Sequence, residues 1–432
     1  MSHSENARQW VHIGSGAFAL LLRFLTWPQA ALLAGVALAM NALVLPRIGG
    51  RKLYRPDDVA RGFPVGILLY PLSILILILV FRERLDLVAG AWGVLACGDG
   101  FATLIGHRVR SARLPWNHDK SVAGSVAFVV CGSLAAIALQ SWTGNVLVIA
   151  APLTAAIAAA LVESIPVRLD DNISVPLTAG AVLWLATLVT ARAWDDPFVM
   201  ANLPWAIGVN LVISWLGYRA RTVSLSGWLG GAAIGIVIFA AGGAFAWTFL
   251  FLTFVIATVT SRLGLKRKTA LGIAEEKGGR RGAGNAFANC GVAAIAAVMA
   301  VTTAYPAESL LAFAAALTAG GSDTVASEIG KAWGRSTFLI TTLRRVPAGT
   351  PGAMSIQGTM AGLGAAVALA FVAQAGGLIT FHMIVPIVIA STVGAAIESV
   401  LGATAEPAGI LNNDMLNFIN TAVAAVVAIA IA

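Results

Sequence analysis

The chain has 432 residues, of which 58% are hydrophobic and only 11% are charged, and its formal net charge is +8. Soluble domains carry about 25% charged residues, so this composition excludes a soluble globular protein and indicates a chain that folds in a lipid bilayer. Its positive charge falls in short loops between apolar segments. There it indicates membrane topology and anionic substrates, and we expect no nucleic acid partner.

Apolar segments of the length that spans about 30 Å of hydrocarbon recur along the whole sequence. They predict an all-α, polytopic membrane protein with about 15 transmembrane helices. The segments lie near residues 10–25, 28–46, 62–81, 85–106, 121–140, 145–165, 174–193, 200–218, 223–240, 243–261, 283–303, 307–328, 355–375, 378–399 and 411–431.

The loops between these segments differ in charge. If the N-terminus is cytoplasmic and the segments alternate, the outer side holds only Arg23, Arg82, Arg84 and Arg192 of the 28 basic residues. Because short cytoplasmic loops are enriched in Lys and Arg, this asymmetry predicts a multi-pass integral membrane protein with a cytoplasmic N-terminus.

The order of polar residues is the same in two halves of the chain. The matching positions are Asp99, Gly106 and Ser121 in the first half, and Asp323, Gly330 and Ser355 in the second. Such self-similarity predicts two seven-helix repeats, and one linking helix between them keeps both copies parallel, with their polar ends on the cytoplasmic side. The predicted domains are 1–195, the linking helix 196–222, and 223–432.

An acid stands near the cytoplasmic end of one apolar segment in each half. Ionisable residues inside membrane segments are rare because they are expensive to bury, and they usually mark functional sites. We therefore predict Asp99 and Asp323 as the catalytic residues, each binding a metal ion or orienting a substrate hydroxyl. The alternative is an interfacial Asp that simply reaches water.

Basic loops and glycine-rich turns accompany each acid and lead into helix starts. Free N–H groups at helix starts and in glycine-rich turns bind phosphate. The predicted nucleotide- and phosphate-binding residues are Lys120, Ser121, Gly124, Ser125, Lys277, Arg280, Arg281, Arg344, Arg345 and Ser355. The alternative is the ordinary positive charge of cytoplasmic loops together with helix capping.

Further acids lie at helix ends. Carboxylate oxygens suit Mg²⁺, whose coordination is usually completed by substrate phosphates. The predicted metal ligands are Asp99, Glu163 and Asp171 in the first half, and Asp323, Glu328, Glu398 and Asp414 in the second. For the Asp and Asn clusters that follow Glu163 and Glu398, helix capping is the competing interpretation.

Short motifs in the first half, about residues 1–195, resemble those of the polyprenol kinase group, which includes dolichol kinase and phytol kinase. The motifs are Arg8…His12-Ile13-Gly14, Gly98-Asp99-Gly100-Phe101-Ala102 with Gly106, Lys120-Ser121…Gly124-Ser125, and Glu163…Asp170-Asp171-Asn172. The chain departs from the group at Val122-Ala123, where an acidic residue is common, and at Arg8-Gln9, where Arg-Lys is usual.

The second half, about residues 200–432, resembles the phytyl-phosphate kinase family of membrane proteins more densely. The matching pieces are Gly272-Ile273-Ala274, Lys277-Gly278-Gly279-Arg280-Arg281, Asn285, Ala288-Asn289, Asp323-Thr324…Ser327-Glu328-Ile329-Gly330, Ile340-Thr341-Thr342…Arg344-Arg345-Val346-Pro347…Gly349-Thr350, Gly402-Ala403-Thr404 and Asn417-Phe418.

The two resemblances imply a bifunctional kinase. The first half would phosphorylate phytol or a similar isoprenoid alcohol to the monophosphate, and the second would convert the monophosphate to the diphosphate. They also imply CTP as the phosphate donor and Mg²⁺ as the cofactor. The active sites would be cytoplasmic, where a nucleoside triphosphate meets an alcohol dissolved in the bilayer.

Two other functions use similar residues. A cytidylyltransferase that forms a CDP-lipid would need the same surface and the same metal. A transporter of a lipid or lipid phosphate would instead carry acids at the middle of the membrane within broken helices. A third alternative is that only one half is active.

Overall fold

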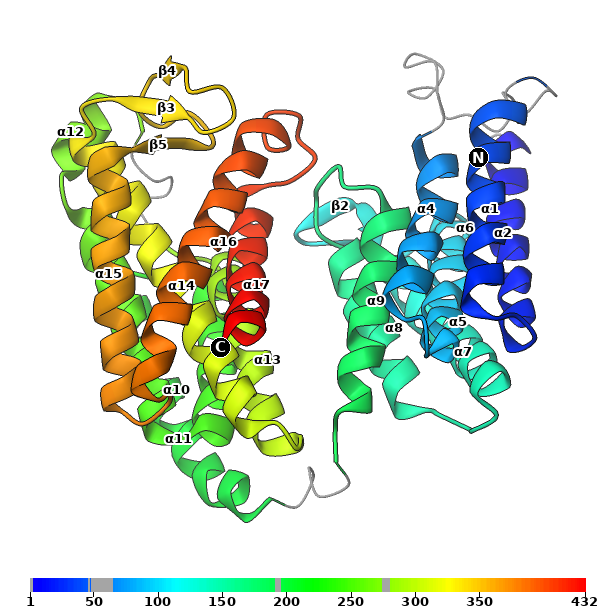
Figure 1. Cartoon of the computed structure of the whole chain (residues 1–432), viewed down its shortest axis with the longest axis horizontal. Coiled ribbons are helices and arrows are strands. Elements are labelled where there is room, and N and C mark those ends of the chain that lie inside the picture. Colours follow the sequence, from blue (N-terminus) through cyan, green and yellow to red (C-terminus); the bar gives the residue numbers. More distant parts are fainter. Residues whose placement is uncertain (1–2, 46, 48–64, 191–195, 274–279) are drawn as a thin grey trace. The chain divides into compact units, whose positions relative to one another are not determined.

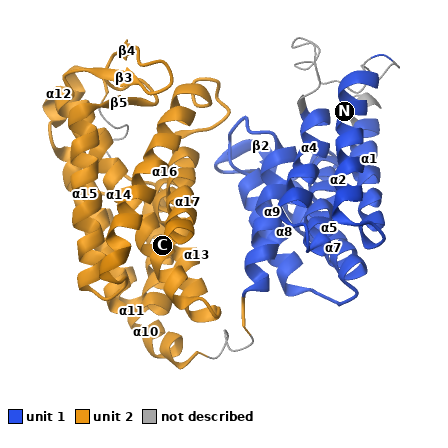
Figure 2. Ribbon diagram, in the orientation of Figure 1, with its two compact units in different colours: residues 1–188 blue, residues 189–432 orange. Residues whose placement is uncertain are grey.

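The computed structural model describes residues 3–45, 47, 65–190, 196–273 and 280–432. The chain forms two compact units, Met1–Leu188 and Val189–Ala432 (Figure 2). Ten of the described helices are long and apolar enough to cross a membrane, so the chain is an all-α, polytopic membrane protein. The count of about 15 crossings and the two seven-helix repeats remain predictions.

Unit 1 is a helical bundle whose most buried long segment is α5 with its continuation (Figure 1). Its elements are α1 (His3–Ser15), η1 (Gly16–Arg23), α2 (Trp27–Ala39), η2 (Met40–Val44), α4 (Val65–Val80), α5 (Leu85–Gly93), η4 (Val94–Asp99), α6 (Gly100–Arg108), β1 (Arg113–Leu114), β2 (Asn117–Ser121), α7 (Val122–Gly144), α8 (Ala150–Glu163) and α9 (Asp171–Thr187). Leu87, Val88, Ala89 and Ala91 of α5 are completely buried, and α5 packs on α7 and α9.

Unit 2 is a helical bundle around α14. Its elements are α10 (Pro197–Arg219), α11 (Leu225–Arg262), α12 (Leu265–Ala270), α13 (Ala283–Thr302), α14 (Pro306–Trp333), β3 (Thr337–Leu339), β4 (Arg345–Val346), β5 (Ala353–Ser355), α15 (Ile356–Ala375), η7 (Phe381–Met383), α16 (Ile384–Thr404) and α17 (Asn413–Ile431). Residues 311–322 of α14 are all buried, and residues 323–326 are partly buried. Most are Ala, Gly, Ser or Thr, which let neighbouring helices approach closely in lipid.

The predicted linking helix 196–222 corresponds to α10. This helix packs along α11 and belongs to unit 2, because the division between the units falls after Leu188. The three strands β4, β3 and β5 form a small antiparallel sheet between α14 and α15. In unit 1, β1 and β2 pair in the corresponding position before α7.

Helix α11 consists of two antiparallel arms. Its 38 residues would extend about 57 Å as one straight helix, but Gly243 has a φ of +75°, a conformation that glycine adopts without strain. Arg281 joins the two ends: its carbonyl accepts from the N–H of Ser224 (3.0 Å), and its guanidinium donates to the hydroxyl of Ser261 (3.3 Å). The break separates the two segments that the sequence predicted at 223–240 and 243–261.

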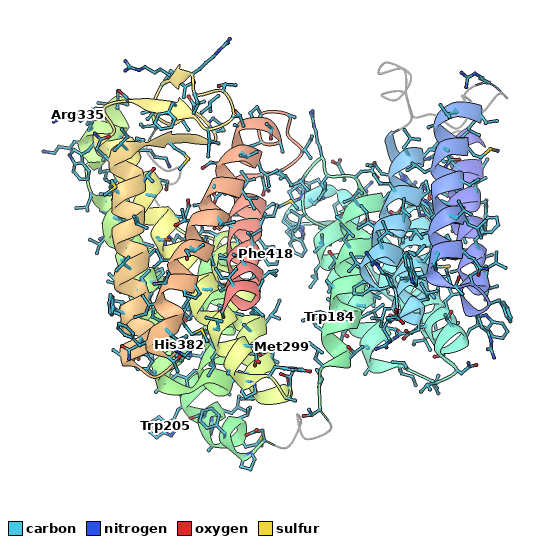
Figure 3. The ribbon with its side chains drawn as sticks, in the orientation of Figure 1. Trp184, Trp205, Met299, Arg335, His382 and Phe418 are labelled. Atoms are coloured by element: carbon cyan, nitrogen blue, oxygen red, sulfur yellow. The ribbon has the colours of Figure 1, made fainter. Side chains whose placement is uncertain are left out.

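The basic side chains of unit 2 gather at one end. Every Lys and Arg that the structure describes in this unit lies near the helix ends that adjoin α12 or the β3–β5 sheet: Arg219, Arg221, Arg262, Lys266, Arg267, Lys268, Arg280, Arg281, Lys331, Arg335, Arg344 and Arg345. Arg335 marks this end, and His382 lies near the opposite end (Figure 3). Cytoplasmic loops show this distribution, and the orientation in the membrane remains a prediction.

In each unit, two glycines let a pair of helices approach closely. The pair is α6, which directly follows Asp99, with α7 in unit 1, and α14, which carries Asp323, with α15 in unit 2. In unit 1, a Cβ built on Gly124 of α7 would lie 3.4 Å from the Cα of Gly106 in α6. In unit 2, a Cβ on Gly358 of α15 would lie 3.1 Å from the Cα of Gly330 in α14 and 2.5 Å from the carbonyl oxygen of Ala326. Both helix pairs therefore require glycine for their close approach.

Replacing Gly358 by Ala is expected to destabilise unit 2 by about 1–3 kcal/mol, because the added methyl group forces α14 and α15 apart. The matched control is Gly364→Ala on the same helix, where an added Cβ meets nothing within 4 Å. This control should be neutral or stabilising by about 0.5–1 kcal/mol. Thermal unfolding in detergent measures both, and equal melting temperatures would contradict the close contact.

Candidate active site

Asp99 stands at a turn of π-helix. Helix α5 continues into η4, which ends at Asp99, and α6 begins at the next residue. Such π-turns are frequent at functional sites. The carboxylate of Asp99 lies 3.5 Å from Nε2 of His12, and the same nitrogen lies 3.1 Å from the carbonyl oxygen of Leu95. His12 is therefore a direct neighbour of the predicted catalytic acid.

Three acids that are far apart in the sequence come together in unit 1. One carboxylate oxygen from each of Asp99, Glu163 and Asp171 lies within 4.8 Å of the others. Glu163 ends α8 and Asp171 begins α9, so the connection between these helices brings both acids to the end of η4. These are the three acids predicted as metal ligands for the first half. Among the described residues, no other group of three His, Cys, Asp or Glu side chains is as close.

Lys120 of β2 reaches into this cluster. Its ammonium group forms an ion pair with Glu163 and lies 3.4 Å from Asp171. Burial lowers the pKa of Lys120, but the charges of Asp171, Glu163 and Asp99 outweigh burial, so that its pKa is raised. Burial raises the pKa of Asp171 to about 7, against the opposing charge of Lys120. The lysine therefore stays charged and offsets part of the negative charge that the acids share.

The atoms of this cluster fit a hard divalent cation. Mg²⁺ binds protein through one or two carboxylates and keeps coordination positions for water and substrate phosphates. Glu163 is buried, whereas Asp99 and Asp171 are only partly buried, so their oxygens remain accessible to a phosphate group. Lys120 is also partly exposed and offers a positive charge beside them.

Unit 2 has a related arrangement around Lys331. The charge of Lys331 acts on Asp323 and on Glu406, while Asp323 and Glu406 both act on Glu398. Burial raises the pKa of Glu406, and the charge of Lys331 opposes this shift. Lys331 is therefore an electrostatic neighbour of Asp323 and Glu406, although its direct ion pair is with Glu328, 3.2 Å away.

Glu406 is an acid that the sequence prediction missed. Asp171 follows Glu163 by eight residues, and Glu406 follows Glu398 by the same number. This equal spacing could have identified Glu406 from the sequence. The predicted ligand Asp414 lies instead in the first turn of α17, against the start of α13. Glu406 is an electrostatic neighbour of Glu398 and a further candidate ligand, while Asp414 as a metal ligand stays a prediction.

Glu328 does not share a site with Asp323. In one unbroken helix, side chains five residues apart point about 140° away from each other. Glu328 forms an ion pair with Lys268 of α12, and its other oxygen lies 3.2 Å from Nζ of Lys331. Lys268 also donates to the carbonyl oxygen of Ser261 (2.6 Å). Both oxygens of Glu328 therefore pair with lysines, and its part as a metal ligand stays a prediction.

The predicted phosphate sites at the starts of α7 and α15 are helix caps. The hydroxyl of Ser121 accepts a hydrogen bond from the N–H of Gly124 (3.2 Å), and that of Ser355 accepts from Gly358 (3.1 Å). The helix backbone at Gly106 stands beside Gly124. Both serines therefore cap helices and Gly124 packs against α6, while their part in phosphate binding stays a prediction.

Helix capping also explains two residues of the polar clusters. Asp170 accepts from the N–H of Asn172 (3.0 Å) at the start of α9, and Asn412 accepts from the N–H of Met415 (2.9 Å) at the start of α17. Asp171, by contrast, belongs to the acid cluster with Asp99 and Glu163.

The remaining predicted phosphate-binding residues occupy different environments. Ser125 is partly buried on α7, and its hydroxyl oxygen has no hydrogen-bond partner within the described part of the chain. Arg281 is partly buried before α13, whereas the exposed arginines are Arg280, Arg344 and Arg345. Lys277 lies outside the described residues.

Three further residues near the two sites were not predicted as site residues. His12 was already part of a short motif, which was its only signal. Asn420 is fully buried against Gly394 of α16, and it follows the motif residue Asn417 by three positions on α17. Lys268 gave no sequence signal that distinguishes it from its basic neighbours.

Comparison with known proteins identifies the family. The family model described as integral membrane protein DUF92 matches residues 208–425, just over half of the chain. The chain belongs to this family. The family assignment agrees with the polytopic helical structure and covers most of unit 2.

Several relatives are similar over part of the chain. The uncharacterized membrane protein sll0875 of Synechocystis sp. is 38% identical over 235 residues, which cover 53% of this chain and 91% of that protein. Protein VTE6, chloroplastic, of Arabidopsis thaliana is 36% identical over 233 residues, 52% of this chain and 70% of VTE6. Probable phytol kinase 2, chloroplastic, of Glycine max is 34% identical over 195 residues, 41% of this chain and 64% of that protein. No solved structure matches the chain.

Proposed function

We propose that the chain phosphorylates an isoprenoid alcohol, such as phytol, in two consecutive steps with CTP as donor. Unit 1 forms the monophosphate, and unit 2 converts it to the diphosphate. The observation that carries the proposal is the cluster of Asp99, Glu163 and Asp171 around Lys120. It joins accessible carboxylates and a cation at helix ends, and relatives named as probable phytol kinases support the substrate class.

The residues of the unit 1 cluster match what phosphoryl transfer requires, which is positioning and charge neutralisation more than covalent chemistry. Mg²⁺ would be held by Asp99, Glu163 and Asp171 in unit 1, and by Asp323, Glu398 and Glu406 in unit 2. When bound, it neutralises charge on the phosphates of the donor.

Asp99 orients the alcohol in the first step. The alcohol oxygen attacks the γ-phosphorus of CTP, the bond to the β-phosphate oxygen breaks, and CDP leaves. The proton of the hydroxyl passes to the Asp99 carboxylate, which His12 holds at 3.5 Å. Lys120 compensates the charge that gathers on the phosphates. A long apolar alcohol dissolves in the bilayer, and its hydroxyl reaches the level of these helix ends.

Equivalent features in the two units support a second site and the predicted repeat. Both units contain a glycine pair between two helices, a serine-capped helix start, and a lysine that pairs with a glutamate. The gathering of basic residues at the same end of unit 2 as Lys331 supports a cytoplasmic location for that site. Similarity to VTE6 and membership of the DUF92 family are compatible with a separate activity in this unit.

Two labelled forms of CTP separate the kinase from its alternatives. Purified protein in detergent is incubated with phytol, Mg²⁺ and CTP that is labelled either in the γ-phosphate or in the cytosine. We expect only the γ-phosphate label to enter the lipid fraction, first as monophosphate and then as diphosphate. Cytosine label in lipid would identify a cytidylyltransferase. Binding of phytol with no consumption of CTP would favour a transporter.

A further inference from the structure

Unit 2 contains a cavity of about 390 Å³ that is lined by α10, both arms of α11, α13 and α14. Most of its lining is apolar or aromatic, and it includes Ile234, Leu250, Phe254 and Leu317. It lies in the half of the bundle that is nearer to Arg281, since α13 contributes only its first turns. A slot of this kind suits an apolar chain that enters from the bilayer.

One wall of the cavity is polar. Arg281 lines it just before α13, and Asn285 and Asn289 follow, one helical turn apart on the same face. The amide nitrogen of Asn289 donates to the carbonyl of Asn285 (3.0 Å), and its buried Oδ1 has no hydrogen-bond partner among the residues described. An unsatisfied buried polar atom of this kind requires an explanation, such as a ligand.

The charged member of this wall is held in position. The guanidinium of Arg281 donates to the hydroxyl of Ser261 (3.3 Å), and it lies 5.9 Å from the ring of Phe254. Its backbone N–H donates to Thr222 (3.1 Å). A planar, permanently charged guanidinium recognises phosphate oxygens well.

The polar wall lies close to the acid of the second site. Gly320 and Thr324 of α14 line the cavity, and Asp323 precedes Thr324 in the same helix. The Oδ1 atom of Asn289 lies 3.2 Å from the position of a Cβ on Gly320. A phosphate held along this wall would therefore lie within about one helical turn of Asp323.

We infer that this cavity holds an isoprenoid monophosphate, with its apolar chain between α10, α11 and α14 and its phosphate along Arg281 and Asn289. The inference rests on the proposed function of unit 2 and names the binding site of its substrate. Arg281 is the one cation among the described lining residues, and its charge favours the monophosphate over the free alcohol. The apolar remainder favours a prenyl chain over a nucleotide.

Gly231 allows the cavity to be filled without disturbing its walls. It lines the cavity, and a Cβ built on it meets nothing within 4 Å, so the side chain in Gly231→Leu enters the empty space. Gly364→Leu is the matched control, because an added Cβ there also meets nothing within 4 Å and Gly364 does not line the cavity. Both variants are first compared with wild type by gel filtration and thermal unfolding.

The test combines turnover with binding. Phosphorylation of phytyl monophosphate and of dimethylallyl monophosphate is measured, together with photolabelling by a diazirine-bearing phytyl monophosphate. We expect Gly231→Leu to raise KM for the phytyl substrate at least about tenfold, because it displaces buried apolar chain. KM for the short substrate should change little. Photolabelling of α11 and α13 peptides should fall in parallel, and Gly364→Leu should behave as wild type.

The other possible results show whether the binding inference or the proposed function fails. If wild type phosphorylates both substrates and Gly231→Leu leaves both KM values and the photolabelling unchanged, the cavity is not the binding site, while the kinase function stands. If wild type phosphorylates neither substrate but Gly231→Leu still suppresses labelling, the binding inference stands and the proposed function fails. Absence of labelled α11 and α13 peptides in wild type would overturn the inference.

Discussion

Replacing Asp99 by Asn is expected to reduce formation of the monophosphate from phytol on the order of 10³-fold. The same variant should still convert supplied monophosphate to diphosphate at nearly the wild-type rate. Asp323→Asn should show the opposite pattern and accumulate the monophosphate. The reason is that each acid lies among the other charged groups of its own unit, Asp99 with Glu163 and Asp171, and Asp323 with Lys331 and Glu398.

Asn keeps the size of the side chain but removes the charge that would bind a cation or take up the hydroxyl proton in the proposed reaction. Thin-layer separation of radiolabelled lipid products measures each step. The control is Asp119→Asn on β2, where an exposed carboxylate is changed in the same way and both steps should persist. If Asp99→Asn and Asp323→Asn each lose both steps equally, the division of labour between the units is wrong.

The same assay decides which acid completes the second cluster. Glu406→Gln should accumulate monophosphate as Asp323→Asn does, because Glu406 lies within reach of Glu398 and Lys331. Asp414→Asn should leave the second step largely intact. The reverse outcome would restore the acid that the sequence analysis chose.

Lys268→Met is expected to destabilise unit 2 by about 3–5 kcal/mol, the usual effect of removing one partner from a buried ion pair. Both side chains of the Lys268–Glu328 pair are only 2% exposed, so water cannot replace the lost charge. Such a loss corresponds to a fall in Tm of roughly 10 °C for a domain of this size. Thermal unfolding in detergent measures the change.

Two variants test the origin of that loss. Lys331→Met removes the other lysine near Glu328, but this side chain is 31% exposed, and we expect a loss of about 1 kcal/mol. The double variant Lys268→Met/Glu328→Leu should recover most of the stability, since it leaves no buried charge unpaired. If the Lys268→Met protein has the same melting temperature as wild type, the ion pair contributes little to stability.

Much of this protein follows from its sequence because the bilayer is a demanding solvent. Lipid offers no hydrogen bonds to the backbone, so long apolar runs must be helical. Each of the fifteen predicted segments overlaps described helical residues, including the two arms of α11 that meet at Gly243, and ten described helices are long and apolar enough to cross a membrane. The acids Asp99, Glu163 and Asp171 were also recognisable, because ionisable residues next to apolar segments are rare.

The sequence left the contacts between helices undetermined. It could not distinguish Glu328, which turns toward Lys268, from Glu406, which reaches Glu398, since the choice depends on helix rotation and on where a loop returns. It also offered both a helix cap and a phosphate site at Ser121; the structure shows the cap, and the phosphate site stays a prediction.

By itself, then, the sequence determined where the chain crosses apolar surroundings and which acids are unusual enough to matter. Only the tertiary structure decided which of those acids meet, that His12 stands beside Asp99, and that α10, α11, α13 and α14 enclose a cavity. The physical reason is that apolar length and charge are local properties of the chain. Side-chain neighbours arise from the packing of helices that are distant in sequence.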